Sequence, residues 1–146
     1  MENYVIATSS TADLTAEYMQ EHHIPFISYT YTIDDQVYKD DCTAESKAFL
    51  FSKMREDKLP NTSQISEYAY YEFFKGILDQ GQDILFTDMS RAISGSVANA
   101  EAAIREVSAE YPERRIYFID SYCITGGLHL FVKQLVKRKE AGMTMD

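Results

Sequence analysis

Residues 83–120 read DILFTDMSRAISGSVANAEAAIREVSAEYPERRIYFID, and this stretch decides the fold. Its two short apolar runs, 83–87 and 115–119, are typical of strands that are buried on both faces of a sheet. Between them, 95–110 is rich in Ala and Glu, which favour a helix, and Pro112 closes that helix. Strands separated by such a helix pair in parallel, so the sequence predicts an α/β fold with an open, mostly parallel sheet flanked by helices.

The segments on either side of this stretch extend the alternation of strand and helix. An apolar run at 4–7 predicts another buried strand, and 14–23 predicts a helix for which Asp13 is available as the N-cap. The β-forming residues of 26–39, divided by a turn signal at 34–35, predict an added β-hairpin. Further helices are expected at 44–58, 67–79 and 128–139, and a polar loop is expected at 62–66.

Composition limits the classes of protein to which the chain can belong. Its 146 residues suit one domain with a hydrophobic core, and its formal net charge is −9. Such a charge argues against nucleic acid and anionic membranes as partners, since both attract basic surfaces. No apolar run approaches the ~20 residues of a membrane span, so we expect no stable membrane insertion. Cys42 and Cys123 match no metal or redox spacing, and without an evident signal peptide we expect free thiols in a cytoplasmic protein.

Loops rich in serine and threonine precede several of the predicted helices. In an open α/β sheet such loops gather at the carboxyl edge of the strands, where ligands bind, and helix N-termini there favour an anion. Ser and Thr are also the preferred N-caps, so each loop taken alone is explained equally well as a helix cap. The loops are Ser9-Ser10-Thr11, Thr62-Ser63-Gln64, Ser94-Gly95-Ser96, and Ser121 with Thr125-Gly126-Gly127.

The chemistry of these loops favours a small acid over a nucleotide. The sequence contains neither G-x-x-x-x-G-K-[ST] nor G-x-G-x-x-G, and the loops hold little positive charge apart from Arg91. A polyphosphate usually needs Lys, Arg or a metal, whereas two or three hydroxyl or amide donors satisfy a single carboxylate. The loops therefore predict a carboxylate site with no cofactor and no metal.

A catalytic alternative stays open at this point. Residues 92–96 read AISGS, which lacks the outer glycines of the G-x-S-x-G nucleophile elbow, yet Ser94 could serve a serine hydrolase-like enzyme acting on a small molecule. The acidic pairs at 34–35 and 40–41 are interpreted as turn residues and not as metal ligands. We expect a binding protein without catalytic residues of its own.

Five segments, taken in order, resemble the DegV family. The family's D-S-T-A-D-L start corresponds to 9–14, its T-S-Q-P-S loop to 62–66, and its S-S-G-L-S-G-T loop to 90–96. An I-D-S segment with a Ser/Gly-rich helix start corresponds to 119–127, and the family's hairpin corresponds to 24–40. Each motif alone has low specificity, but the ordered set covers essentially the whole chain.

The resemblance implies a bacterial fatty-acid-binding protein of phospholipid metabolism. Such a protein holds a long-chain fatty acid and offers its carboxylate to a separate fatty acid kinase, whose catalytic subunit performs the phosphorylation. Residues 1–146 then form the N-terminal α/β domain, and the family's second, C-terminal domain is absent from this chain. The resemblance assigns binding of the carboxylate to Thr62 and Ser94. The residues expected to support these two are Ser63, Gly95, Ser96, Ser10 and Ser121.

Four positions depart from the family pattern. Ser9 stands where the family has its opening Asp, Ile65 replaces the Pro of T-S-Q-P-S, and Arg91 and Ala92 replace Ser and Gly. Arg91 is expected to alter the head-group contact or the surface that faces the kinase. The missing second domain leaves a third interpretation, in which the chain is a truncated domain with no ligand of its own.

Overall fold

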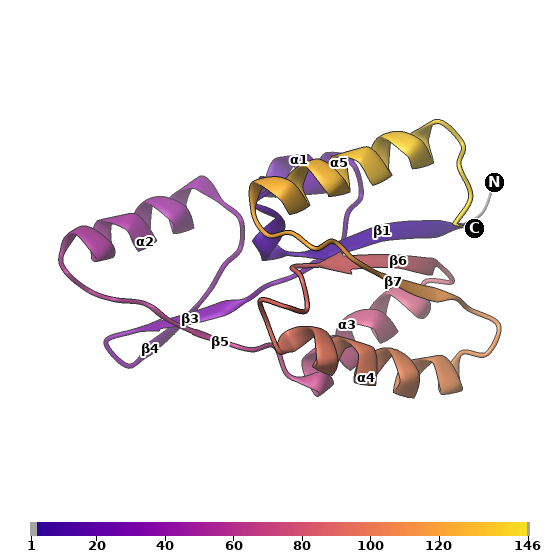
Figure 1. Cartoon of the computed structure of the whole chain (residues 1–146), viewed down its shortest axis with the longest axis horizontal. Coiled ribbons are helices and arrows are strands. Elements are labelled where there is room, and N and C mark those ends of the chain that lie inside the picture. Colours follow the sequence, from indigo (N-terminus) through magenta and orange to yellow (C-terminus); the bar gives the residue numbers. More distant parts are fainter. Residues whose placement is uncertain (1–2, 146) are drawn as a thin grey trace.

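The computed structural model describes residues 3–145. Its centre is a sheet of four parallel strands in the order β2-β1-β6-β7 (Figure 1). This arrangement confirms the predicted α/β fold, because the apolar runs at 4–7 and 83–87 lie in the two inner strands. The bounds are β1 (Tyr4–Ser9), β2 (Phe26–Ile27), β6 (Asp83–Asp88) and β7 (Ile116–Asp120).

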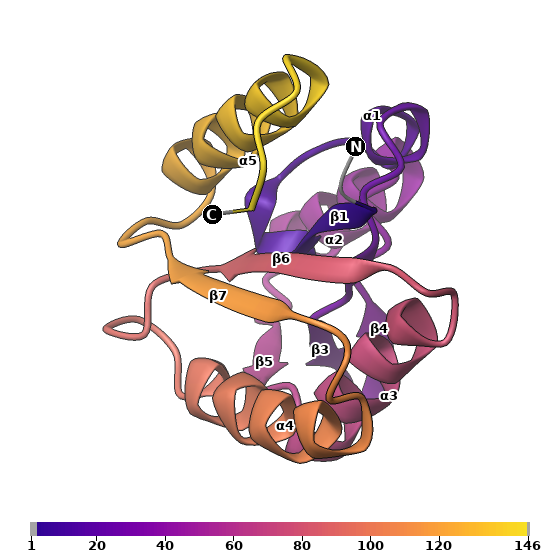
Figure 2. The same ribbon diagram turned by 90° about the vertical axis from the view of Figure 1, so that its right-hand side faces the viewer.

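Helices cover both faces of this sheet (Figure 2). Helices α1 and α5 lie on one face, and α3 and α4 lie on the other. Alternate side chains of a strand point to opposite faces, so Val5 packs into one core and Ile6 into the other. None of the helices in residues 3–145 combines the length and the hydropathy needed to cross a lipid bilayer. The bounds are α1 (Ala16–Glu21), α3 (Glu67–Leu78), α4 (Ser96–Glu110) and α5 (Gly126–Glu140).

A smaller antiparallel sheet stands beside the central one, and α2 lies next to it (Figure 1). Its strand order is β4-β3-β5. The pairing of β3 with β4 confirms the predicted hairpin, and Asp34 and Asp35 both have the positive φ that a tight hairpin turn requires. The bounds are β3 (Thr30–Ile33), β4 (Gln36–Lys39), β5 (Asn61–Ser63) and α2 (Ala44–Arg55).

Two segments pair differently from the prediction. Phe26–Ile27 is not part of the hairpin, because it pairs in parallel with β1 and places Phe26 opposite Thr8. The expected polar loop at 62–66 begins in a strand, since β5 pairs with β3 and places Thr62 opposite Tyr31. Each of these pairings joins segments that are far apart in the sequence, so local patterns gave no sign of them.

The start of α1 also differs from the prediction. Asp13 does not cap this helix; the cap is Thr15, whose hydroxyl accepts a hydrogen bond from the Tyr18 N–H at 3.2 Å. Asp13 instead ends a short 3-10 helix, Ser10–Ala12, in a left-handed conformation with φ of 52°. The chain therefore turns twice between β1 and α1, and the first of these turns holds Thr11 at the carboxyl edge of the sheet.

Phe86 on β6 lies at the centre of an aromatic core. Its ring centroid is 5.0 Å from that of Phe74 and 5.9 Å from those of Tyr70 and Phe118. Phe86, Phe74 and Tyr70 are each fully buried. Contacts of this kind attach α3 to the strand that leads into the predicted site.

We therefore expect Phe86→Ala to lower the free energy of unfolding by about 3–5 kcal/mol, because the lost ring leaves a cavity in a closely packed core. Urea denaturation followed by circular dichroism measures this change. Phe51→Ala is the matched control, since the Phe51 side chain is 52% exposed and its loss should cost less than about 1 kcal/mol. Equal losses for the two variants would contradict this description of the core.

Candidate functional site

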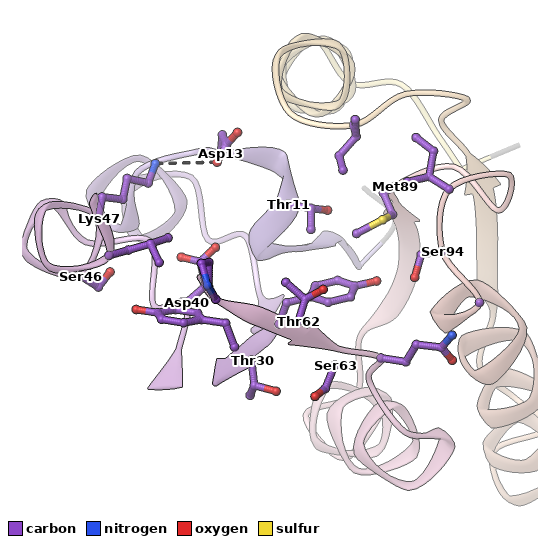
Figure 3. Close-up of a pocket in the computed structure, with 18 of the residues that line it drawn as sticks. Thr11, Asp13, Thr30, Asp40, Ser46, Lys47, Thr62, Ser63, Met89 and Ser94 are labelled. Carbon is purple, nitrogen blue, oxygen red and sulfur yellow. Dashed lines mark ion pairs between the residues drawn. The ribbon is translucent and has the colours of Figure 1, made fainter. Parts of the chain in front are cut away.

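A cavity of about 870 Å³ opens between the small sheet with α2 and the carboxyl edge of the central sheet (Figure 3). Thr11 reaches it from the turn after β1, and Met89 reaches it from the end of β6. The opposite wall comes from β3, β5 and α2, and includes Leu50 and Phe51. The cavity thus lies where the carboxyl ends of parallel strands are expected to bind a ligand.

Thr62 and Ser94, the two residues assigned to the carboxylate, line this cavity together (Figure 3). Thr62 is held on β5 by its pairing with β3. Ser94 lies in the loop before α4, where its Oγ accepts a hydrogen bond from the Ser96 N–H at 3.1 Å. A hydroxyl that accepts in this way keeps its own proton, so Ser94 can still donate to a ligand.

The five supporting positions divide into two groups. Ser63 and Gly95 line the cavity beside Thr62 and Ser94. Ser10, Ser96 and Ser121 do not line it, because their hydroxyls bind the backbone instead. Ser10 accepts from the Tyr29 N–H at 3.0 Å, Ser96 accepts from the Ile65 N–H at 3.1 Å, and Ser121 donates to the Asp88 carbonyl at 2.8 Å. These three serines fix the loops that surround the site.

Gly95 is needed for space and not for an unusual backbone conformation. Its φ is −67°, which any residue adopts, but an added Cβ would lie 2.6 Å from the amide nitrogen of Gln64. Gly95 is also the N-cap of α4 and has no side chain of its own to cap this helix end, where the Ser94 hydroxyl binds the Ser96 N–H. The partial positive charge of the helix N-terminus therefore lies close to Ser94.

The cation at the cavity is not the one that the sequence suggested. Arg91 is 55% exposed and binds Asp120 and Glu101, each at 2.9 Å, and it does not line the cavity. Lys47 on α2 does line it, and its Nζ lies 3.9 Å from a carboxylate oxygen of Asp13. In Figure 3 this pair lies at the far side of the cavity from Ser94. The negative charge of a ligand near Thr62 and Ser94 would therefore have to be balanced by hydroxyls and by the N-terminus of α4.

A buried carboxylate, which the sequence patterns did not predict, lies behind the cavity wall. Asp88, the last residue of β6, is fully buried and accepts hydrogen bonds from the hydroxyls of Ser9 at 2.5 Å and Tyr70 at 2.7 Å. Longer contacts come from Thr11 at 3.3 Å and Tyr29 at 3.5 Å. We call these five residues the Asp88 cluster. The only sequence signal was an acidic residue directly after the apolar run ILFT.

Burial is the dominant influence on the acidity of the cluster. It raises the pKa of Asp88, and the hydrogen bonds from Ser9 and Tyr70 oppose the rise. Burial and the charge of Asp88 also raise the pKa of Tyr70 and of Tyr29, so both phenols stay protonated at neutral pH. The cluster therefore consists of one carboxyl group surrounded by hydroxyl donors.

The hydroxyl of Tyr70 should matter for stability because it donates to a buried carboxylate. We expect Tyr70→Phe to lower the free energy of unfolding by about 1.5–3 kcal/mol, as is usual for a hydrogen bond to a charged group. Urea denaturation of Tyr71→Phe is the control, because the hydroxyl of Tyr71, the next residue of the same helix, donates to Glu110 in an exposed hydrogen bond. A Tyr70→Phe protein as stable as the control would show that Asp88 does not rely on this donor.

The sequence and the structure both match known proteins. A family model described as "Uncharacterised protein, DegV family" matches residues 3–146. A DegV domain-containing protein from Clostridium perfringens is 31% identical over 148 residues, which is all of this chain and 50% of that protein. The chain thus spans about half the length of this curated relative.

Solved structures share the fold. The crystal structure of a stearic-acid-binding protein from Eubacterium ventriosum is 25% identical, with a TM-score of 0.85 over 97% of this chain and 49% of its own. The fatty acid kinase B3 protein of Streptococcus pneumoniae, solved with linoleic acid, is 20% identical with a TM-score of 0.76, over 97% of this chain and 50% of its own. At that identity the second likeness concerns the fold alone. From the family match over residues 3–146, we conclude that this chain belongs to the DegV family.

Proposed function

We propose that this chain binds a long-chain fatty acid, with the carboxylate at Thr62 and Ser94 and the acyl tail along the apolar wall of the cavity. The observation that carries the proposal is that one cavity of about 870 Å³ contains both hydroxyls together with apolar side chains. The E. ventriosum relative, which binds stearic acid, supports the same class of ligand. The apolar lining comprises Leu50, Phe51, Pro60, Met89, Ile93 and Ile124.

The two ends of a fatty acid place opposite demands on a site. Each buried methylene contributes about 0.8 kcal/mol, so a long tail supplies most of the affinity. The carboxylate loses its hydration on binding, and this is costly unless donors replace the water. Two hydroxyls and the N-terminus of α4 meet that need without a full positive charge. Specificity for tail length would then reside in the apolar wall.

We further propose that the chain is a carrier and that a separate fatty acid kinase phosphorylates the bound carboxylate. The resemblance of the motifs to the DegV family supports this role, and so does the exposure of Thr62, which leaves the head group within reach of a partner. The chain spans about half the length of the C. perfringens and E. ventriosum relatives, so the activity of the whole protein is part of this proposal and is not given by the fold.

No specific observation favours the serine hydrolase alternative. Among residues 3–145, the histidine side chains form their recorded hydrogen bonds elsewhere: His22 binds Glu140 at 2.8 Å and His129 binds the Asp13 carbonyl at 3.3 Å. The recorded hydrogen-bond partner of the Ser94 hydroxyl is the Ser96 backbone N–H. A serine nucleophile needs a general base within hydrogen-bond reach, and none of these groups fills that role at neutral pH.

The two hydroxyls can be tested by removing them together. We expect Thr62→Ala with Ser94→Ala to weaken palmitate binding by about ten- to a hundredfold, because each hydroxyl would donate to a charged carboxylate. Isothermal titration calorimetry on the purified chain measures the dissociation constant. Thr32→Ala with Ser108→Ala is the matched control, since it removes the same two groups from positions that do not line the cavity. Unchanged affinity in the Thr62/Ser94 variant, or a wild-type chain that never binds palmitate, would refute the proposal.

A further inference from the structure

Asp88 is separated from the cavity by a single layer of residues. Three of the groups that hydrogen-bond to its carboxylate also line the cavity: Thr11, Tyr29 and the backbone N–H of Met89, which donates at 2.7 Å. A site proposed for an anionic head group thus has a second carboxyl group directly behind its wall. The two would repel each other if both were ionised.

In the part of the chain that the structure describes, no ion pair neutralises this carboxyl group. Among residues 3–145, the recorded ion pairs leave out Asp88, and β1 with the turn after it presents only the hydroxyls of Ser9 and Thr11. The segment after β2 presents Tyr29, and α3 presents Tyr70. On β7, the residue that pairs with Asp88 is Asp120, whose carboxylate binds Arg91 at 2.9 Å. Burial raises the pKa of Asp88, which brings proton uptake closer to neutral pH.

Tyr29 connects Asp88 to the proposed head-group site. Its hydroxyl donates to Asp88 at 3.5 Å, and Tyr29 lines the same cavity as Ser94. A tyrosine hydroxyl has one proton, so while that proton points at an ionised Asp88 it cannot be donated to a ligand in the cavity. Protonation of Asp88 removes this demand and frees the hydroxyl of Tyr29.

We propose that Asp88 is a positioning residue that couples the binding of a fatty acid to the uptake of one proton by the Asp88 cluster. The proposal rests on the proposed function. When the ligand carboxylate arrives, Asp88 accepts a proton from the solvent, its carboxylate becomes a neutral carboxylic acid, and the hydroxyl of Tyr29 turns towards the ligand. Release of the ligand returns the proton to the solvent. The net charge of the site is the same before and after binding.

Linkage fixes the sign and the size of the effect. Between the pKa of Asp88 in the empty protein and its higher pKa in the complex, affinity for the fatty acid falls by up to about tenfold for each unit of rising pH. Outside that interval Asp88 adds no pH dependence to the affinity. A residue that served only to hold the fold would lower the affinity equally at every pH when replaced.

Calorimetry in pairs of buffers with different ionisation enthalpies measures the protons taken up per palmitate bound. Over a series of pH values we expect up to one proton for the wild-type chain, and no such uptake for Asp88→Asn, whose affinity should be independent of pH. Tyr29→Phe keeps the carboxyl group but removes the hydroxyl that connects it to the cavity, so its uptake should also fall; this variant carries the test if Asp88→Asn does not fold. Asp35→Asn, in an exposed turn, removes the same charge and should behave as the wild type.

The outcomes separate the two proposals. If the chain binds palmitate while wild-type, Asp88→Asn and Tyr29→Phe proteins take up equal numbers of protons, the role of Asp88 is overturned and the fatty-acid site stands. If no protein binds palmitate at any pH, the proposed function fails and the coupling fails with it. Lower affinity in Asp88→Asn at every pH with unchanged uptake would reduce Asp88 to a structural residue.

Discussion

The parallel pairing of β1 with β6 is the constraint on which the rest of the structure depends. Its register places Ala7 opposite Phe86, so that both strands reach the same edge of the sheet together. Residues 5–7 and 84–86 are apolar, and the buried polar residues of the two strands lie at their carboxyl ends: Thr8, Ser9, Thr87 and Asp88. Because these ends meet inside the protein, the side chains of Ser9 and Asp88 have to satisfy each other, and the Asp88 cluster is the result.

The site needs a second wall, which the central sheet does not provide. That wall is the small sheet with α2. The small sheet is itself assembled from segments that are distant in the sequence, such as β5 and β3. Ser94 is therefore placed by the central sheet and Thr62 by the small one. The relative position of the two hydroxyls depends on the packing between two sheets, and it follows from neither sheet alone.

Much of the fold could be predicted from local patterns. The strands at 83–88 and 116–120, the helix between them and the hairpin turn at 34–35 are each specified by residues within a few positions. Thr62 and Ser94 line one cavity, and the carboxylate binding that the motifs imply for them stays a prediction. Ser10, Ser96 and Ser121 show the limit of such reasoning, because a hydroxyl near a site can face a ligand or bind a backbone group, and only the surrounding loops decide which. Asp88 and Lys47 escaped notice because neither belongs to a Ser/Thr loop.

Helix α2 forms one side of the cavity, yet none of its residues is fully buried. Substitutions on this helix therefore cost little of the free energy that holds the central sheet together. On the proposed function, related chains can thus diverge in the width or length of the acyl tail that they accept by changing α2. The sheet edge that would bind the carboxylate stays the same. Ligand preference and structural integrity reside in different parts of this small chain, which leaves each free to evolve without harming the other.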